Sequence, residues 1–217
     1  MTGATRIIAI RHGETAWNVD TRLQGHLDIG LNDRGQWQAA RAAEALADED
    51  ITAIYSSDLS RAFATATAIS NRNSSPGARP VHAHAGLRER GFGIFEGLTY
   101  AQVASDWPEE SLRWRQRDPD FAPRGGESLI QVRDRIAATV NILAGLHVGE
   151  QIVLVAHGGV MDALYRLATR QDIESPRTWD LGNASINRLL WTPDGLSLVG
   201  WSDTRHLDDA TLDETST

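Results

Sequence analysis

Short apolar runs alternate with amphipathic stretches along this chain. Three runs, Arg6–Ile10, Ile51–Tyr55 and Ile152–Ala156, have the length and the β-branched content of buried strands. Between them, Gly35–Leu46 and Leu59–Ser70 place apolar residues at helical spacing. Strands that are apolar along their whole length are typical of a sheet covered on both faces. The pattern therefore predicts an α/β fold with a mostly parallel sheet between helices.

The same pattern continues to the end of the chain. Val81–His84 predicts a short third strand, and Ser128 is expected to cap a helix that runs to about residue 146. Val160–Ala168 predicts a further helix, and a turn between Arg188–Trp191 and Leu196–Trp201 predicts a terminal hairpin. No linker divides these elements, so we predict a single domain over residues 1–203 and an acidic tail over residues 204–217.

Residues 91–126 interrupt the alternation of strands and helices. The segment breaks into short pieces that carry several aromatic side chains, among them Tyr100, Trp107, Trp114 and Phe121. We expect a lid-like excursion packed over one end of the sheet. Its aromatic residues predict either the packing of the lid itself or a wall around an organic ligand.

Composition excludes several kinds of chemistry. The chain has 217 residues, a net charge of -8 and no cysteine, and all 21 basic residues are arginine. A cysteine nucleophile, a thiolate metal site, a Schiff-base lysine and a P-loop lysine are therefore excluded. An acidic chain is a poor general binder of nucleic acid, so we expect none. Anionic groups must be bound by arginine, histidine or backbone N–H groups.

Membrane insertion and export are also not expected. No apolar run approaches the roughly 20 residues that a membrane span requires. Residues 1–5 lead directly into the first predicted strand, with no basic segment or cleavage site of a secretory signal. We predict a cytoplasmic protein that does not bind membranes.

Two predicted strands end in the same dipeptide, His-Gly. Arg11-His12-Gly13 follows the first strand, and His157-Gly158-Gly159 follows Ile152–Ala156. Ligand sites of parallel sheets lie beyond the carboxyl ends of the strands, so neighbouring strands would bring both imidazoles into one crevice. Gly158 and Gly159 would let a ligand approach the backbone at a helix N-terminus.

Three interpretations of these histidines stay open from the residues alone. Each could be a satisfied polar group at a strand end, or the pair could hold a metal. The cation of Arg11 argues against a metal and in favour of a phosphate, and Arg61 on the second helix adds a similar charge. His82 and His84 share one strand face and could also suggest a metal site, although a solvated strand face explains them better.

Five motifs in order resemble the histidine phosphatase superfamily, the phosphoglycerate mutase-like proteins. The first is Arg11-His12-Gly13-Glu14-Thr15, followed by Trp17-Asn18. The others occur in the order that is typical of the family: Arg22-Leu23-Gln24-Gly25, Ser56-Ser57-Asp58-Leu59-Ser60-Arg61-Ala62, Leu87-Arg88-Glu89-Arg90 with Phe95-Glu96-Gly97, and Ala156-His157-Gly158-Gly159. The resemblance implies a three-layer α/β/α sandwich and no metal or organic cofactor.

The resemblance also implies roles for individual residues. His12 is similar to the nucleophile that becomes phosphohistidine, and Glu89 to the proton donor and acceptor. Arg11, Arg61 and His157 correspond to groups that bind the transferring phosphoryl. The positions similar to phosphate- or substrate-contacting residues are Asn18, Gln24, Gly25 and Gly158.

Phosphatases and mutases share this family, and we predict a phosphatase. The segment between Glu89 and His157 is shorter than in cofactor-dependent mutases, and Arg113, Arg115 and Arg117 do not match their arginine pair. The predicted function is metal-independent hydrolysis of a small phosphorylated metabolite. Phosphoglycerate mutase is the alternative, and an inactive phosphate-binding or protein-interaction module is a second one. The terminal hairpin and tail could also form a homodimer.

Overall fold

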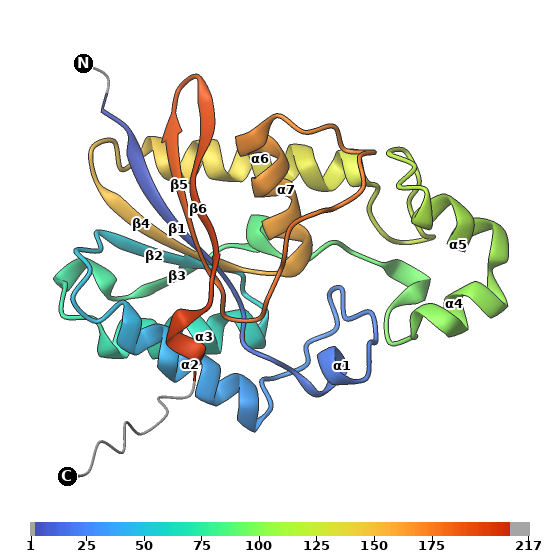
Figure 1. The fold of residues 1–217 in the computed structure, drawn as a ribbon, viewed down its shortest axis with the longest axis horizontal. Coiled ribbons are helices and arrows are strands. Elements are labelled where there is room, and N and C mark those ends of the chain that lie inside the picture. The colour runs from blue at the N-terminus through green and yellow to red at the C-terminus, as the bar shows by residue number, and fades with distance from the viewer. Residues whose placement is uncertain (1–2, 209–217) are drawn as a thin grey trace, which may run out of the picture.

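The computed structural model describes residues 3–208. Its strands and helices follow one another in the order β1 (Thr5–Arg11), α1 (Ala16–Val19), α2 (Asp33–Ala45), β2 (Ala53–Ser56), α3 (Ser60–Arg72), β3 (Val81–Ala83), α4 (Tyr100–Asp106), α5 (Pro108–Arg115), α6 (Leu129–Gly145), β4 (Gln151–Ala156), α7 (Gly158–Thr169), β5 (Ile186–Thr192) and β6 (Gly195–Asp203) (Figure 1). No helix within the described range is long and apolar enough to cross a membrane.

The strands form one sheet in the order β3-β2-β4-β1-β5-β6. The first four strands run parallel, and β5 and β6 add an antiparallel edge. β1 and β4 are direct neighbours, and their register pairs Arg11 with Ala156. The prediction of a mostly parallel sheet is confirmed, and the two His-Gly segments leave the sheet side by side.

Helices cover both faces of the sheet and make the predicted three-layer sandwich. Alternate residues of β1 point into different cores, because successive side chains of a strand face opposite sides. Ile8 and Ile10 pack with residues of α2 and α3, whereas Ile7 and Ala9 pack with residues of α6 and α7. Both cores are buried, and together they fix the ends of β1 and β4 from two sides.

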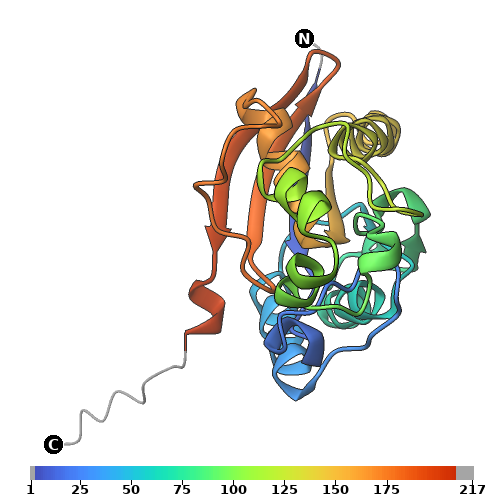
Figure 2. The same ribbon diagram turned by 90° about the vertical axis from the view of Figure 1, so that its right-hand side faces the viewer.

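The segment 91–126 lies at one end of the sandwich, where α4 and α5 face the viewer in Figure 2. Phe95, Val103 and Phe121 of this segment form a small core together with Leu23, which lies between α1 and α2. The Phe95 ring stacks on Trp114 with centroids 5.5 Å apart and lies 5.4 Å from Trp107. The predicted packing role of these aromatic residues is therefore observed, in a cluster separate from the two main cores.

Two elements differ from the pattern-based prediction. α7 begins at Gly158, directly after β4, so the helix starts two residues earlier than expected. α1 was not predicted; it depends on a capping box in which Thr15 and Asn18 exchange side-chain and backbone hydrogen bonds. A helix of four residues is too short to show a periodic pattern of apolar side chains, so the sequence pattern could not predict α1.

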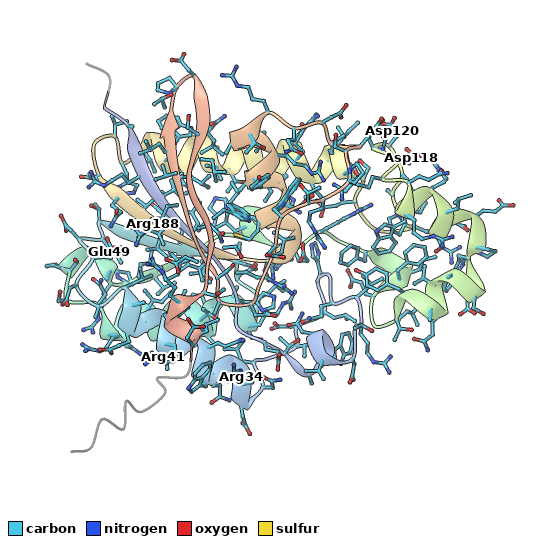
Figure 3. The ribbon with its side chains drawn as sticks, viewed as in Figure 1. Arg34, Arg41, Glu49, Asp118, Asp120 and Arg188 are labelled. Carbon is cyan, nitrogen blue, oxygen red and sulfur yellow. The ribbon has the colours of Figure 1, made fainter. Side chains whose placement is uncertain are left out.

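The first residues of the predicted tail pack against α2. Residues 205–207 form one 3₁₀ turn, and Arg41 Nε donates a hydrogen bond to the carbonyl of His206 over 2.8 Å (Figure 3 labels Arg41). The remainder of the predicted tail, residues 209–217, lies outside the described residues.

Candidate active site

His12 and His157 lie next to each other at the carboxyl ends of β1 and β4. The amide of His12 donates to the carbonyl of Ala156 over 2.9 Å, which extends the parallel ladder by one residue. The two rings meet edge to face with centroids 5.1 Å apart, and both are buried. The structure thus brings the two predicted imidazoles together in the way that neighbouring strands require.

The tautomer of His12 follows from one contact. Its Nδ1 lies 2.6 Å from the carbonyl oxygen of Gly13, and a carbonyl only accepts, so Nδ1 carries the proton. Burial lowers the pKa of His12 well below its usual value, and the cations of Arg11 and Arg61 lower it further. The ring is therefore neutral at pH 7, with Nε2 as a free lone pair.

Arg61 is held in place by the turn that precedes α2. It is fully buried, and Nη1 and Nη2 donate to the carbonyls of Leu27 and Gly25 over 2.9 and 2.8 Å. Gly25 has a φ of +52°, and an added Cβ would lie 2.1 Å from Glu96 Oε1. Glycine at this position therefore permits the turn that fixes the Arg61 guanidinium.

Several buried polar side-chain atoms at this site have no protein partner among the described residues. They include the N–H donors Arg11 Nε and Arg61 Nε and both ring nitrogens of His157, one of which donates in the neutral ring. Arg11 Nη1 donates to the carbonyl of Leu181, which orients its guanidinium. Buried polar groups are normally hydrogen-bonded, so a cluster of unsatisfied donors around His12 indicates a binding site for an anion.

Glu89 lies at the N-terminus of α7. Its Oε1 accepts hydrogen bonds from the amides of Arg90 and Gly159 over 2.8 and 3.0 Å. A Cβ on Gly159 would lie 2.3 Å from the same oxygen, so only glycine permits this close approach. His26 Nε2 contacts the carbonyl of Glu89 over 2.9 Å and helps to fix its loop.

A pocket of about 380 Å³ joins these groups. Its lining includes Arg11, His12, Arg61 and Glu89, together with the other predicted residues Asn18, Gln24, Gly25 and Gly158. Asn18 Oδ1 accepts from the amide of Thr15 over 3.0 Å, so part of its role is to cap α1. The predicted site residues therefore converge on one cavity, with His157 behind His12.

Further lining residues were not predicted from the sequence. Asp162 on α7 and Arg177 in the loop between α7 and β5 both reach the pocket. Asp162 stands four residues before Arg166 and forms an ion pair with it at 3.0 Å, a helical spacing that sequence analysis could have used. Arg177 carries no such signal, because a single arginine in an irregular loop is usually a surface residue.

The alternative of a metal site finds no support in the described range. Residues 3–208 contain no group of three or more histidine and acidic side chains arranged to hold a metal ion. His84 Nδ1 accepts from the amide of Gly86 over 3.0 Å, and the His82 ring lies 5.4 Å from that of Tyr55. Both are thus structural parts of the β3 edge.

The family follows from the whole chain as well as from this site. The sequence model of the histidine phosphatase superfamily (branch 1) matches residues 7–204. The chain belongs to this superfamily, as the order of its motifs predicts.

Relatives within the superfamily include two proteins of Arabidopsis thaliana and one mycobacterial enzyme of known structure. Phosphoglycerate mutase-like protein 4 is 39% identical over 94% of this chain and 87% of its own length. A metal-independent phosphoserine phosphatase is 36% identical over 94% of this chain and 83% of its own. The structure of mycobacterial glucosyl-3-phosphoglycerate phosphatase with VO3 matches with a TM-score of 0.81 and 35% identity, over 92% of this chain and 99% of that one.

These relationships confirm the predicted fold class and the predicted activity class. The chain is a phosphatase of the histidine phosphatase superfamily, and the mutase alternative is the weaker one.

Proposed function

We propose that this protein hydrolyses a small phosphomonoester through a phosphohistidine at His12, without a metal ion. The observation that carries the proposal is the His12 ring: a neutral imidazole with Nδ1 bound to the Gly13 carbonyl and Nε2 free, surrounded by unsatisfied donors. Such a ring is a nucleophile oriented toward an anion site.

In the first step, His12 Nε2 attacks phosphorus while the bond from phosphorus to the ester oxygen breaks. Glu89, entering this step protonated, transfers its proton to the departing oxygen. Arg11, Arg61 and His157 stabilise the charge on the equatorial oxygens, since phosphoryl transfer depends mainly on positioning and electrostatics. The products are an alcohol, an ionised Glu89 and a phosphohistidine.

In the second step, water attacks the phosphohistidine and the bond between phosphorus and Nε2 breaks. Glu89 accepts a proton from this water, and inorganic phosphate leaves. His12 regains its lone pair, and both residues return to their starting states. The hydrogen bond from Nδ1 to Gly13 keeps the ring in one orientation through both steps.

The first test is phosphate release with EDTA present. We would assay p-nitrophenyl phosphate, phosphoserine, 3-phosphoglycerate and glucosyl-3-phosphoglycerate, esters suggested by the names of the relatives. Release that persists in EDTA supports the proposal. Loss of activity in EDTA that a divalent metal restores would overturn metal independence, and efficient conversion of 3- to 2-phosphoglycerate with little release would favour a mutase.

The decisive variant is His12→Ala, with His12→Gln as a variant of closer volume. Both remove the nucleophile, so phosphate release is expected to fall by at least about 10³-fold. Circular dichroism would establish that the fold is retained. A folded variant with near wild-type turnover would exclude the phosphohistidine mechanism.

A further inference from the structure

The loop that carries Glu89 lies against the N-terminal half of α6. Leu87 is fully buried in the same core as Val132 and Ile136 of that helix. Residues 88–91 belong to no helix or strand, so their backbone carbonyl and N–H groups need other partners. The partners that this loop finds decide how firmly the Glu89 carboxylate is held.

Arg135 on α6 supplies most of these partners. Its Nη1 donates to the carbonyls of Gly86 and Arg88, each over 3.0 Å, and its Nη2 lies 3.4 Å from the carbonyl oxygen of Glu89. Its Nε and Nη2 also donate to the two carboxylate oxygens of Glu127, both over 2.8 Å. All three nitrogens of this planar donor group are therefore engaged, either with the loop or with Glu127.

Glu127 extends the same contacts to the chain that follows Glu89. Its Oε2 accepts from the amide of Gly91 over 2.8 Å, and its carbonyl accepts from Arg90 Nε over 2.8 Å. Burial raises the pKa of Glu127, but the hydrogen bonds from Arg135 and Gly91 outweigh this effect and hold the pKa below its usual value. Glu127 is thus ionised at neutral pH, and we call the pair of Arg135 and Glu127 the clamp.

The clamp acts on the loop from outside the phosphate pocket. Neither of its side chains lines that pocket, and they are 22% and 23% exposed, so solvent screens their ion pair less than a surface pair. The Glu89 carboxylate accepts from the amides of Arg90 and Gly159, so its position depends on the backbone that the clamp holds. A proton donor must lie within hydrogen-bond reach of the departing oxygen, and a shift of this backbone would remove it from reach.

We propose that Arg135 is a positioning residue, which holds the loop so that Glu89 can protonate the leaving group. The proposal rests on the proposed function, because it concerns the proton donor of the same reaction. A purely structural Arg135 makes a different prediction. Its loss would reduce the amount of folded enzyme, and hence the turnover of every ester by the same factor.

The test compares two esters of similar size whose leaving groups differ in their need for a proton. Phenol has a pKa of about 10 and leaves poorly without protonation, whereas p-nitrophenol is more acidic and needs a proton less. For Arg135→Met, kcat/KM for phenyl phosphate should fall by about 10- to 100-fold, and for p-nitrophenyl phosphate by a clearly smaller factor. The ratio of the two values does not depend on the folded fraction. Arg135→Lys keeps the charge and should recover part of the loss.

Two further variants show whether Arg135 acts through Glu89. Glu89→Gln should change the ratio in the same direction by more, and Arg135→Met added to it should change the ratio no further. Arg72→Met is the matched control, because Arg72 forms a similar two-bond pair with Glu44 at an exposed site between α3 and α2. It should leave the ratio unchanged. An equal loss for both esters in Arg135→Met, or a further change in the Glu89→Gln background, would overturn the proposal.

Hydrogen exchange separates this proposal from the proposed function, because it needs no turnover. The amides of Arg90 and Gly159, which donate to Glu89, should exchange faster in Arg135→Met than in the wild type or in Arg72→Met. Amides of β4 should exchange at unchanged rates and serve as the internal reference. Selective acceleration supports the positioning role even if the wild type hydrolyses neither ester. Unchanged exchange at both amides would overturn that role while leaving the hydrolysis mechanism intact.

Discussion

At the scale of single residues, the two active-site imidazoles are both buried and uncharged at neutral pH. Burial lowers the pKa values of His12 and His157 well below the usual value, and neighbouring cations contribute to both shifts. The proposed function requires a neutral nucleophile. The fold provides one because burial excludes water from the ring and neighbouring cations disfavour its protonated form. The same arrangement has a consequence for stability in acid.

We expect the free energy of unfolding to decrease as the pH falls from 7 to 5.5. In the unfolded chain both histidines bind protons near pH 6.5, whereas in the folded state they remain neutral to lower pH. Their contribution is thus complete above pH 6.5 and is lost as the pH falls, by about 1.4 kcal/mol per pH unit for each group. Urea unfolding at several pH values measures this slope. His157→Asn should reduce it by about half, whereas His82→Asn, at an exposed position, should not.

Neighbouring glycines at the start of α7 offer a second residue-scale prediction. A Cβ at 159 would lie 2.3 Å from Glu89 Oε1, whereas a Cβ at 158 meets Arg11 Nε at 3.6 Å. Gly159→Ala must displace the Glu89 carboxylate, so kcat should fall on the order of 10²-fold. Gly158→Ala should lower kcat by a clearly smaller factor. Alanine has a higher helix propensity than glycine, so neither variant should lower Tm. Equal losses of kcat in the two variants would show that the position of Glu89 does not depend on Gly159.

At this scale, a functional residue can be predicted from the sequence when it stands at the end of a predicted strand. His12, Arg11 and His157 stand at the ends of apolar runs, which makes their convergence predictable from strand order. The partner of His12 Nδ1 is a backbone carbonyl, and side-chain patterns carry no information about such a group. Arg177 was missed for a related reason, since only the folded loop brings it to the pocket around His12.

At the scale of elements, the segment 91–126 is stabilised separately from the sandwich. Its core includes Phe95, which is fully buried between Trp107 and Trp114 and outside the two main cores. Pattern analysis could detect that the alternation of strands and helices stops here. It could not give the bounds of α4 and α5, because their short amphipathic stretches depend on aromatic contacts within the segment 91–126.

Phe95→Ala should destabilise the segment 91–126 selectively. Deleting a buried aromatic ring costs about 3–5 kcal/mol, and here the loss falls on the small core around Phe95. Hydrogen exchange should accelerate over residues 91–126, with little change in β1 and β4. Phe63→Ala removes a ring that is 37% exposed on α3 and should alter neither region appreciably. Equal acceleration in residues 91–126 and in the sheet would mean that the cores are not energetically separate.

At the scale of the whole molecule, the anion site connects distant parts of the chain. Arg11 ends β1, Arg61 belongs to α3, Glu89 follows β3, and His157 follows β4. An anion that engages these groups links both faces of the sandwich. The ends of the predicted strands indicated that His12 and His157 converge, whereas Arg61 and Glu89 were placed at the site only by the family resemblance, and the cavity shape required the folded chain.

Inorganic phosphate should therefore stabilise the entire fold. Occupation of the site at about 100 times Kd adds roughly 2.7 kcal/mol and should raise Tm by about 5–10 °C. Thermal unfolding with phosphate, compared with chloride at matched ionic strength, measures the effect. A shift of equal size with chloride would indicate general screening instead of a specific site.

The small core around Phe95 makes the segment 91–126 exchangeable. The groups proposed for the reaction lie on the sandwich, whereas the pocket-lining residues Tyr100, Trp114 and Arg117 come from the segment 91–126. Because the apolar cluster of that segment is separate from the two main cores, the segment can change its sequence or length without repacking the strands that hold His12 and His157. Changes in the segment 91–126 can then accommodate new leaving groups, while the residues of the sandwich that act on phosphorus stay the same.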